Sequence, residues 1–166
     1  MMPLKYVVED VRCPIIQNGQ RALIIHCVND IVCMGSGVAK ALYEKWPLVR
    51  QEYMKWGKSG HNFELGNIQA VKVEEDIAVI NMIGQRDIKP LNGIPPIRYG
   101  AIRKCVRKTA DIAKKYNATV HCPYKMGSDL AGGKWEEIEK ILIEELANND
   151  IVTVIYDVFN QRAKGS

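Results

Sequence analysis

Short runs of hydrophobic residues alternate with helical patterns along this chain of 166 residues. Apolar runs bounded by turn residues predict strands over residues 4–8, 22–28, 68–73, 76–83, 118–122 and 151–156. Apolar positions spaced by three and four predict helices over residues 38–46, 47–58, 97–116 and 134–147. Strands that alternate with helices, without an internal repeat, are typical of an α/β protein.

The character of the strands indicates how the sheet is built. The run over residues 22–28 is almost wholly apolar, which is typical of a strand covered on both faces. Glu74 and Glu75 separate two further runs by a short turn, which predicts a hairpin. We therefore predict a three-layer α/β/α sandwich on a mixed central sheet. It forms one domain over residues 1–159, followed by a polar tail over residues 160–166.

Two glycine-rich turns each lie between an apolar strand and a helix. The first is Met34-Gly35-Ser36-Gly37-Val38, and the second runs from Gly127 to Gly133. Such turns hold phosphate groups, because backbone N–H groups point outward and the helix dipole adds roughly half a positive charge. One Gly-x-Gly alone is a weak signal, since many such turns merely reverse the chain. The pair predicts an anion site at the carboxyl edge of the sheet.

Composition narrows the classes of partner and site. The net charge of +4 fits a protein that handles an anionic small molecule, but also an ordinary soluble domain. No apolar run reaches the ~20 residues that cross a membrane, and residues 1–8 do not resemble a signal peptide, so we expect a cytoplasmic protein without a membrane partner.

The cysteines do not predict a disulfide framework. They number five, and none forms a C-x-x-C pair. The dipeptides His26-Cys27 and His121-Cys122 could each offer only one ligand to a shared ion, because neighbouring side chains on a strand point to opposite faces. We therefore expect neither a metal nor another cofactor.

The ordered motifs resemble those of the macrodomains. They are Asp10 after the first strand, His26-Cys27-Val28-Asn29 leading to residues 34–39, and residues 123–135, which read Pro-Tyr-Lys-Met-Gly-Ser-Asp-Leu-Ala-Gly-Gly-Lys-Trp. More narrowly, they resemble the branch of ADP-ribose-1''-phosphate phosphatases and the terminal ADP-ribose protein glycohydrolase. The resemblance spans nearly the whole chain. It implies the α/β/α fold, ADP-ribose or a derivative as ligand, and ADP-ribosylated protein as a further partner.

The resemblance also implies roles for individual residues. Asp10 matches the aspartate that accepts a hydrogen bond from the adenine amino group, and the two glycine turns match the loops that clasp the diphosphate and the distal ribose. Asn29 matches a residue that points at the distal ribose, although it could instead bond its own backbone. The expected ligand-binding residues are Asp10, Val11, Asn29, Met34, Gly35, Ser36, Gly37, Val38, Gln85, Gly127, Ser128, Asp129, Leu130, Ala131, Gly132 and Phe159.

Gln85, Tyr156 and His26 each have two possible roles. Gln85 could bond a ribose or its own loop. Phe159 and Tyr156 are candidates to stack on adenine, but core packing is the alternative role of Tyr156. His26 could act as an acid or base, or it could be a buried histidine bonded to a neighbouring strand.

The sequence departs from the family pattern at the catalytic positions. Residues 81–86 contain no lysine where the glycohydrolase has one, and Ala131 stands where its loop has an aspartate, so a lysine Schiff-base route is not supported. Asp129 is the replacement candidate for a general base, with His26 or Asn29 orienting water. Asp129 could also be a turn residue, or a charge that repels the phosphates.

We therefore predict an ADP-ribose-binding protein that hydrolyses ADP-ribose-1''-phosphate to ADP-ribose and phosphate. One alternative is a non-catalytic reader of ADP-ribose, and another is a hydrolase that removes ADP-ribose from modified protein. Basic residues along the helix over residues 97–116 could contact nucleic acid, but such a run is usually the solvated side of an amphipathic helix. Nucleic acid is accordingly not expected as a partner.

Overall fold

The computed structural model describes residues 3–17, 19–128 and 131–164. Its strands are β1 (Leu4–Val7), β2 (Arg21–Asn29), β3 (Ile68–Glu74), β4 (Ile77–Gln85), β5 (Ala118–Pro123) and β6 (Thr153–Tyr156). Its helices are α1 (Gly37–Lys45), α2 (Leu48–Ser59), α3 (Tyr99–Tyr116), α4 (Trp135–Glu145), α5 (Gln161–Lys164) and a 3₁₀ turn over Ala147–Asn149.

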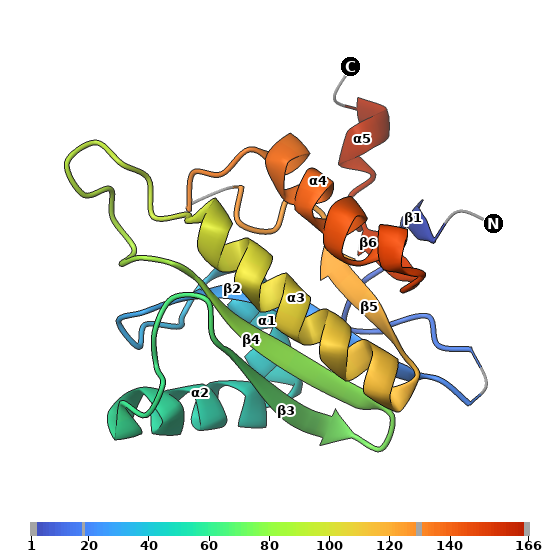
Figure 1. Ribbon diagram of the computed structural model, residues 1–166, viewed down its shortest axis with the longest axis horizontal. Helices are drawn as coiled ribbons and strands as arrows, with labels where there is room; N and C mark the ends of the chain where they lie inside the picture. The colour runs from blue at the N-terminus through green and yellow to red at the C-terminus, as the bar shows by residue number, and fades with distance from the viewer. Residues whose placement is uncertain (1–2, 18, 129–130, 165–166) are drawn as a thin grey trace.

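The strands form one mixed sheet in the order β1-β6-β5-β2-β4-β3. Only the β3–β4 hairpin among these pairs is antiparallel, and the remaining pairs are parallel. α3 crosses the near face of the sheet beside α4, while α1 lies behind it (Figure 1). The three-layer α/β/α sandwich on a mixed sheet is therefore confirmed.

Each face of the sheet has its own apolar core. On the α3 and α4 side, Ile25 and Ile80 pack against residues such as Ile102 and Leu142. On the other side, Ile24 and Val79 pack with residues that include Leu42 and Tyr53. The near-continuous apolar pattern of β2 is explained by this arrangement, because both of its faces are covered.

Two boundaries differ from the sequence prediction for identifiable reasons. α3 begins at Tyr99 rather than at residue 97, because the Ile97 N–H donates to the Ala131 carbonyl and the Arg98 N–H donates to the Gly84 carbonyl. These long-range bonds hold the two residues in extended backbone. Ile97 is still buried, as its place in the apolar stripe suggested.

The second difference lies in the predicted tail. Residues 161–164 form the short helix α5, whose first N–H groups are held by the buried Asp157 carboxylate. The Arg162 guanidinium also lies 3.4 Å from the centre of the Tyr6 ring. These contacts attach the start of the polar segment to the domain.

The sheet places the two glycine turns at one edge. β2 pairs in parallel with β5, so the carboxyl ends of both strands lie on the same side of the molecule. The first turn follows β2 and the second follows β5. Loops at the carboxyl ends of adjacent parallel strands are the usual ligand site of such sheets.

Candidate functional site

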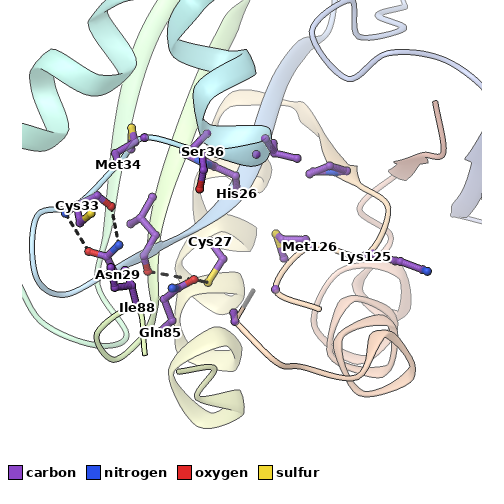
Figure 2. A pocket seen from close by; sticks show the side chains of 18 of the residues that line it. His26, Cys27, Asn29, Cys33, Met34, Ser36, Gln85, Ile88, Lys125 and Met126 are labelled. Carbon is purple, nitrogen blue, oxygen red and sulfur yellow. Dashed lines mark hydrogen bonds between the residues drawn. The ribbon is translucent and has the colours of Figure 1, made fainter. Parts of the chain in front are cut away.

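An open cleft of about 440 Å³ lies between the two glycine turns (Figure 2). Its lining residues are His26, Cys27, Val28, Asn29, Cys33, Met34, Gly35, Ser36, Gly37, Val38, Ala39, Gln85, Ile88, Pro123, Tyr124, Lys125, Met126, Gly127 and Ala131. Segments nearly 100 residues apart in the chain thus face one another, as the paired turns suggested.

Some predicted site residues lie elsewhere. Among the described residues, Asp10, Val11, Ser128, Gly132 and Phe159 do not line this cleft. Asp129 and Leu130 fall outside the described part of the chain, and their roles stay predictions.

The first loop is organised by the side chain of Asn29. Its Oδ1 accepts hydrogen bonds from the N–H groups of Ile31 and Cys33, both at 3.1 Å, and its Nδ2 donates to the Cys33 carbonyl at 2.6 Å. The Tyr53 hydroxyl donates to the Asn29 carbonyl and lies 2.8 Å from both that oxygen and Oδ1. Asn29 therefore holds the loop in shape, and its oxygen is not free to orient water.

Helix α2 supports the same loop from outside the motif. The Arg50 Nε donates to the Met34 carbonyl at 3.1 Å. Val32, with φ of 60°, packs on Gly57, where an added Cβ would come within 2.4 Å of the valine side chain. These supports could not be predicted from the sequence, because nothing in the local sequence connects α2 to a loop that precedes it.

Removal of the Tyr53 hydroxyl should loosen this loop. Tyr53 is fully buried, so a Tyr53→Phe variant leaves the Asn29 oxygens short of a donor, and we expect a loss of about 1–2 kcal/mol in the free energy of unfolding. Urea titration measures the loss. Tyr116→Phe, which changes a half-exposed ring at the far end of α3, is the matched control. Equal stability of the two variants would contradict the assigned role.

The first turn of α1 faces the cleft with unused donors. Ser36, in extended backbone, is the N-cap, and its side chain makes no capping bond in the described structure. The first turn of α1 contains no acidic residue, so its N–H groups and dipole are not offset. By contrast, the first turn of α4 carries Glu136 and Glu137. The N-terminus of α1 is therefore a better anion-binding site than the N-terminus of α4.

A backbone hydrogen bond between Gly127 and Gly133 joins the ends of the second loop, the Gly127–Gly133 ring. Gly127 has φ of +74°, and its carbonyl accepts the Gly133 N–H at 2.9 Å. A Cβ on Gly133 would lie 2.5 Å from that carbonyl oxygen, so only glycine fits there. The Ala131 carbonyl accepts the Ile97 N–H at 3.0 Å, which attaches the ring to the segment before α3.

His26 is a buried, neutral residue at the cleft. It is 2% exposed, and its Nε2 lies 2.5 Å from the Asn81 Oδ1 on β4. Burial lowers the pKa of His26 to about 4, against the weaker opposing effect of the Asn81 hydrogen bond. The buried Nδ1 has no hydrogen-bond partner among the described residues. The predicted bond to a neighbouring strand is thus present.

Gln85 and Cys27 at the cleft contact each other and the loop after β4. The Cys27 Sγ lies 3.7 Å from the Gln85 Oε1 (Figure 2). The Gln85 Nε2 donates to the Asp87 carbonyl at 3.3 Å. Burial raises the pKa of the Cys27 thiol to about 12, so this group is not a thiolate nucleophile near neutral pH. The Asp30 carboxylate accepts the Asp87 N–H at 2.8 Å and joins the loops after β2 and β4.

The residues predicted to meet adenine lie beyond the cleft. The Asp10 carboxylate is bonded by Arg12, whose Nη2 lies 2.7 Å from Oδ2, and these bonds hold the pKa of Asp10 below its usual range. Phe159 is 69% exposed after β6. Tyr156 is buried and its hydroxyl lies 2.7 Å from His121 Nδ1, so core packing is the role that the structure shows for it.

The basic side of α3 is partly neutralised. Arg103 and Arg107 form ion pairs with Glu144 and Glu145 at 2.8–3.0 Å.

No group of three or more His, Cys, Asp or Glu residues that could hold a metal occurs in the described ranges. None of the described helices combines the length and the apolar character that crossing a membrane requires.

Comparison with known proteins identifies the family of this chain. No family model and no curated protein matches the sequence. The structure of a protein of unknown function from Bacteroides thetaiotaomicron is similar, with 40% identity, a TM-score of 0.89, and coverage of 92% of this chain and 96% of that one. A macrodomain protein from Streptomyces coelicolor is 32% identical, with a TM-score of 0.81 and coverage of 93% and 98%.

A third structure shares the fold. Thermosipho africanus DarTG in complex with ADP-ribose is 20% identical, with a TM-score of 0.71, and the match covers 92% of this chain and 41% of that one. At that identity the likeness concerns the fold alone. The Streptomyces protein matches at higher identity over nearly its full length, and on this basis the chain belongs to the macrodomain family.

Proposed function

We propose that the cleft binds ADP-ribose. The observation that carries this proposal is the meeting of two glycine loops over one open cleft, with the unused N–H groups of the α1 first turn at its edge. A diphosphate needs such donors and little else to be held. The Thermosipho protein, which has the same fold, was solved in complex with ADP-ribose.

The ligand would extend from the cleft toward the ends of β1 and β6. In this proposal the diphosphate lies against Gly35–Val38 and the Gly127–Gly133 ring, and the adenine lies near Asp10, Val11 and Phe159. The Arg12 guanidinium now occupies the Asp10 carboxylate, so it has to turn aside for the adenine amino group to bind. The exposed ring of Phe159 is available for stacking.

We further propose that the protein hydrolyses ADP-ribose-1''-phosphate. Water would attack phosphorus, the ester P–O bond would break, and ADP-ribose and phosphate would leave. The N–H groups of both loops would neutralise the terminal phosphate, which is most of what phosphoryl transfer requires. Since Asn29 is committed to its loop and His26 is a weak neutral base, Asp129 is the remaining candidate of the three to activate water.

A reader function is the second candidate, and one observation favours it. Among the described residues that line the cleft there is no carboxylate, so binding is better supported than proton transfer. Removal of ADP-ribose from modified protein would need the same kind of base. The reaction that is observed would decide whether the chain falls in the narrower branch of the family. It would also decide whether ADP-ribosylated protein is a partner.

Calorimetric titration with ADP-ribose combined with single-turnover assays separates these functions. We expect one ADP-ribose per chain, release of phosphate from ADP-ribose-1''-phosphate, and an Asp129→Ala variant that keeps binding but loses turnover. Binding without product from that ester or from ADP-ribosylated protein would identify a reader. Absence of ADP-ribose binding would contradict the proposed function as a whole.

A further inference from the structure

Val32, in the loop between β2 and α1, has a backbone conformation that suits its residue type poorly. Its φ is 60°, in the left-handed region, where the branched Cβ of a valine crowds the main chain. Most of the other described non-glycine residues with positive φ are asparagine or aspartate, whose short polar side chains tolerate this region. A β-branched residue keeps such a conformation only where its surroundings impose it, and such residues cluster at functional sites.

The hydrogen bonds of Asn29 restrain the backbone on both sides of Val32. The Asn29 Oδ1 accepts the N–H groups of Ile31 and Cys33, which are the two neighbours of Val32 in the chain. The Asn29 Nδ2 also donates to the Cys33 carbonyl at 2.6 Å. Because both neighbours are attached to one side chain, the conformation of Val32 between them is restricted.

Gly57 of α2 provides the room that the Val32 side chain occupies. Val32 is half-buried, and a Cβ built on Gly57 would come within 2.4 Å of one Val32 methyl group and 2.6 Å of the other. Glycine inside a helix is less favourable than alanine, so a glycine there indicates a packing reason. The backbone of Gly57 is not left-handed, and the C-cap of α2 is Gly60, so contact with Val32 is that reason.

The chain runs from Val32 directly into the cleft. Cys33 and Met34 line the cleft, and residues 35–39 follow with the N–H groups of the α1 first turn (Figure 2). We propose that Val32 is a positioning residue whose left-handed backbone, held against Gly57, directs this segment so that its N–H groups face the diphosphate before the ligand arrives. The inference rests on the proposed function, because it takes a diphosphate to be the group that is held. A preorganised loop binds more tightly, since it need not be ordered on binding.

Gly57→Ala tests the inference at a residue that does not line the cleft. The new methyl group displaces Val32, so we expect the affinity for ADP-ribose to fall at least about tenfold. Adding Val32→Gly removes the clashing side chain and adopts the left-handed backbone without strain, so the double variant should bind within about threefold of the unmutated protein. Gly100→Ala, at an open glycine of α3, is the matched control and should leave the affinity unchanged. Calorimetry gives the affinities, and thermal unfolding shows whether each variant is folded.

The rescue distinguishes positioning of the cleft from general stability, because a loss of stability alone does not lower the affinity of the protein that remains folded. A folded Gly57→Ala variant that bound ADP-ribose as tightly as Gly100→Ala would overturn the inference. So would a double variant as weak as Gly57→Ala. Either result would leave ADP-ribose binding by the unmutated protein intact. If the unmutated protein did not bind ADP-ribose, the proposed function would fail instead.

A second pair of variants makes the same test within the loop, should Gly57→Ala not fold. Val32→Pro fixes φ at about −65°, whereas Val32→Asn tolerates the left-handed region. We expect Val32→Pro to bind ADP-ribose at least about tenfold more weakly than Val32→Asn. Equal affinities of these two variants would show that the left-handed backbone at Val32 does not position the site.

Discussion

Replacement of Gly35 by glutamate is expected to weaken ADP-ribose binding at least ~100-fold. Gly35 is exposed at the cleft, and nothing lies within 4 Å of a Cβ built on it, so the new side chain extends into the space assigned to the diphosphate. Two like charges about 4 Å apart near a protein surface repel by roughly 4 kcal/mol. Calorimetric titration of the variant with ADP-ribose measures the loss.

Two control variants distinguish the effect of the new negative charge at the cleft from other effects of substituting a glycine. Gly35→Ala adds a Cβ where there is space and should change affinity less than about threefold. Gly100→Glu places the same carboxylate at another open glycine, on α3 away from the cleft lining, and should leave binding unchanged. If Gly35→Glu bound ADP-ribose as tightly as these controls, the diphosphate could not lie against the first turn.

Acid should destabilise the protein well before its carboxylates titrate. Burial lowers the pKa of both His26 and His121 from 6.5 to about 4. Between these values the unfolded chain binds more protons than the folded one, so the free energy of unfolding falls as the pH drops from about 6.5 to 4. Each histidine contributes a loss of roughly 3 kcal/mol over that interval.

Urea titrations at a series of pH values measure this loss. The pKa values of Asp10 and Glu145 are lowered by arginine neighbours, so their contribution is present above the ordinary carboxyl range and is lost only at lower pH. The His26→Asn variant should lose about half as much stability between pH 6.5 and 4 as the unmutated protein. Histidine NMR signals of His26 and His121 that titrate near pH 6.5 would contradict the prediction.

The fold was predictable because the hydrophobic patterns and turn residues of each segment agree with the way that the segment packs. The uniform apolar run of β2, the acidic turn between β3 and β4 and the striped pattern of α3 each corresponded to an element of the expected kind. Boundaries were less predictable where long-range bonds decide them. Ile97 has a helical spacing, but its N–H is used by Ala131, which lies beyond α3 and β5.

The site was predictable in its backbone and less so in its side chains. Glycine turns after two strands at one sheet edge follow from topology, and both do line the cleft. The partners that fix the first loop, Tyr53 and Arg50, and the partner of His26, Asn81, carry no local signal, because their roles depend on contacts across 16 to 55 residues. The bonds of Asn29 to its own loop show why a matching residue type does not by itself establish a contact with ligand.

Backbone amide NMR during titration with ADP-ribose reports on the very peptide N–H groups that are proposed to hold the diphosphate. We predict the largest shifts at residues 35–39 and at Met126, Gly127 and Ala131, which line the cleft from its two sides. A second groove lies at the opposite edge of the sheet and is lined by residues that include Arg21, Lys72 and Tyr116. Shifts confined to that groove, with the two glycine loops unchanged, would contradict the account.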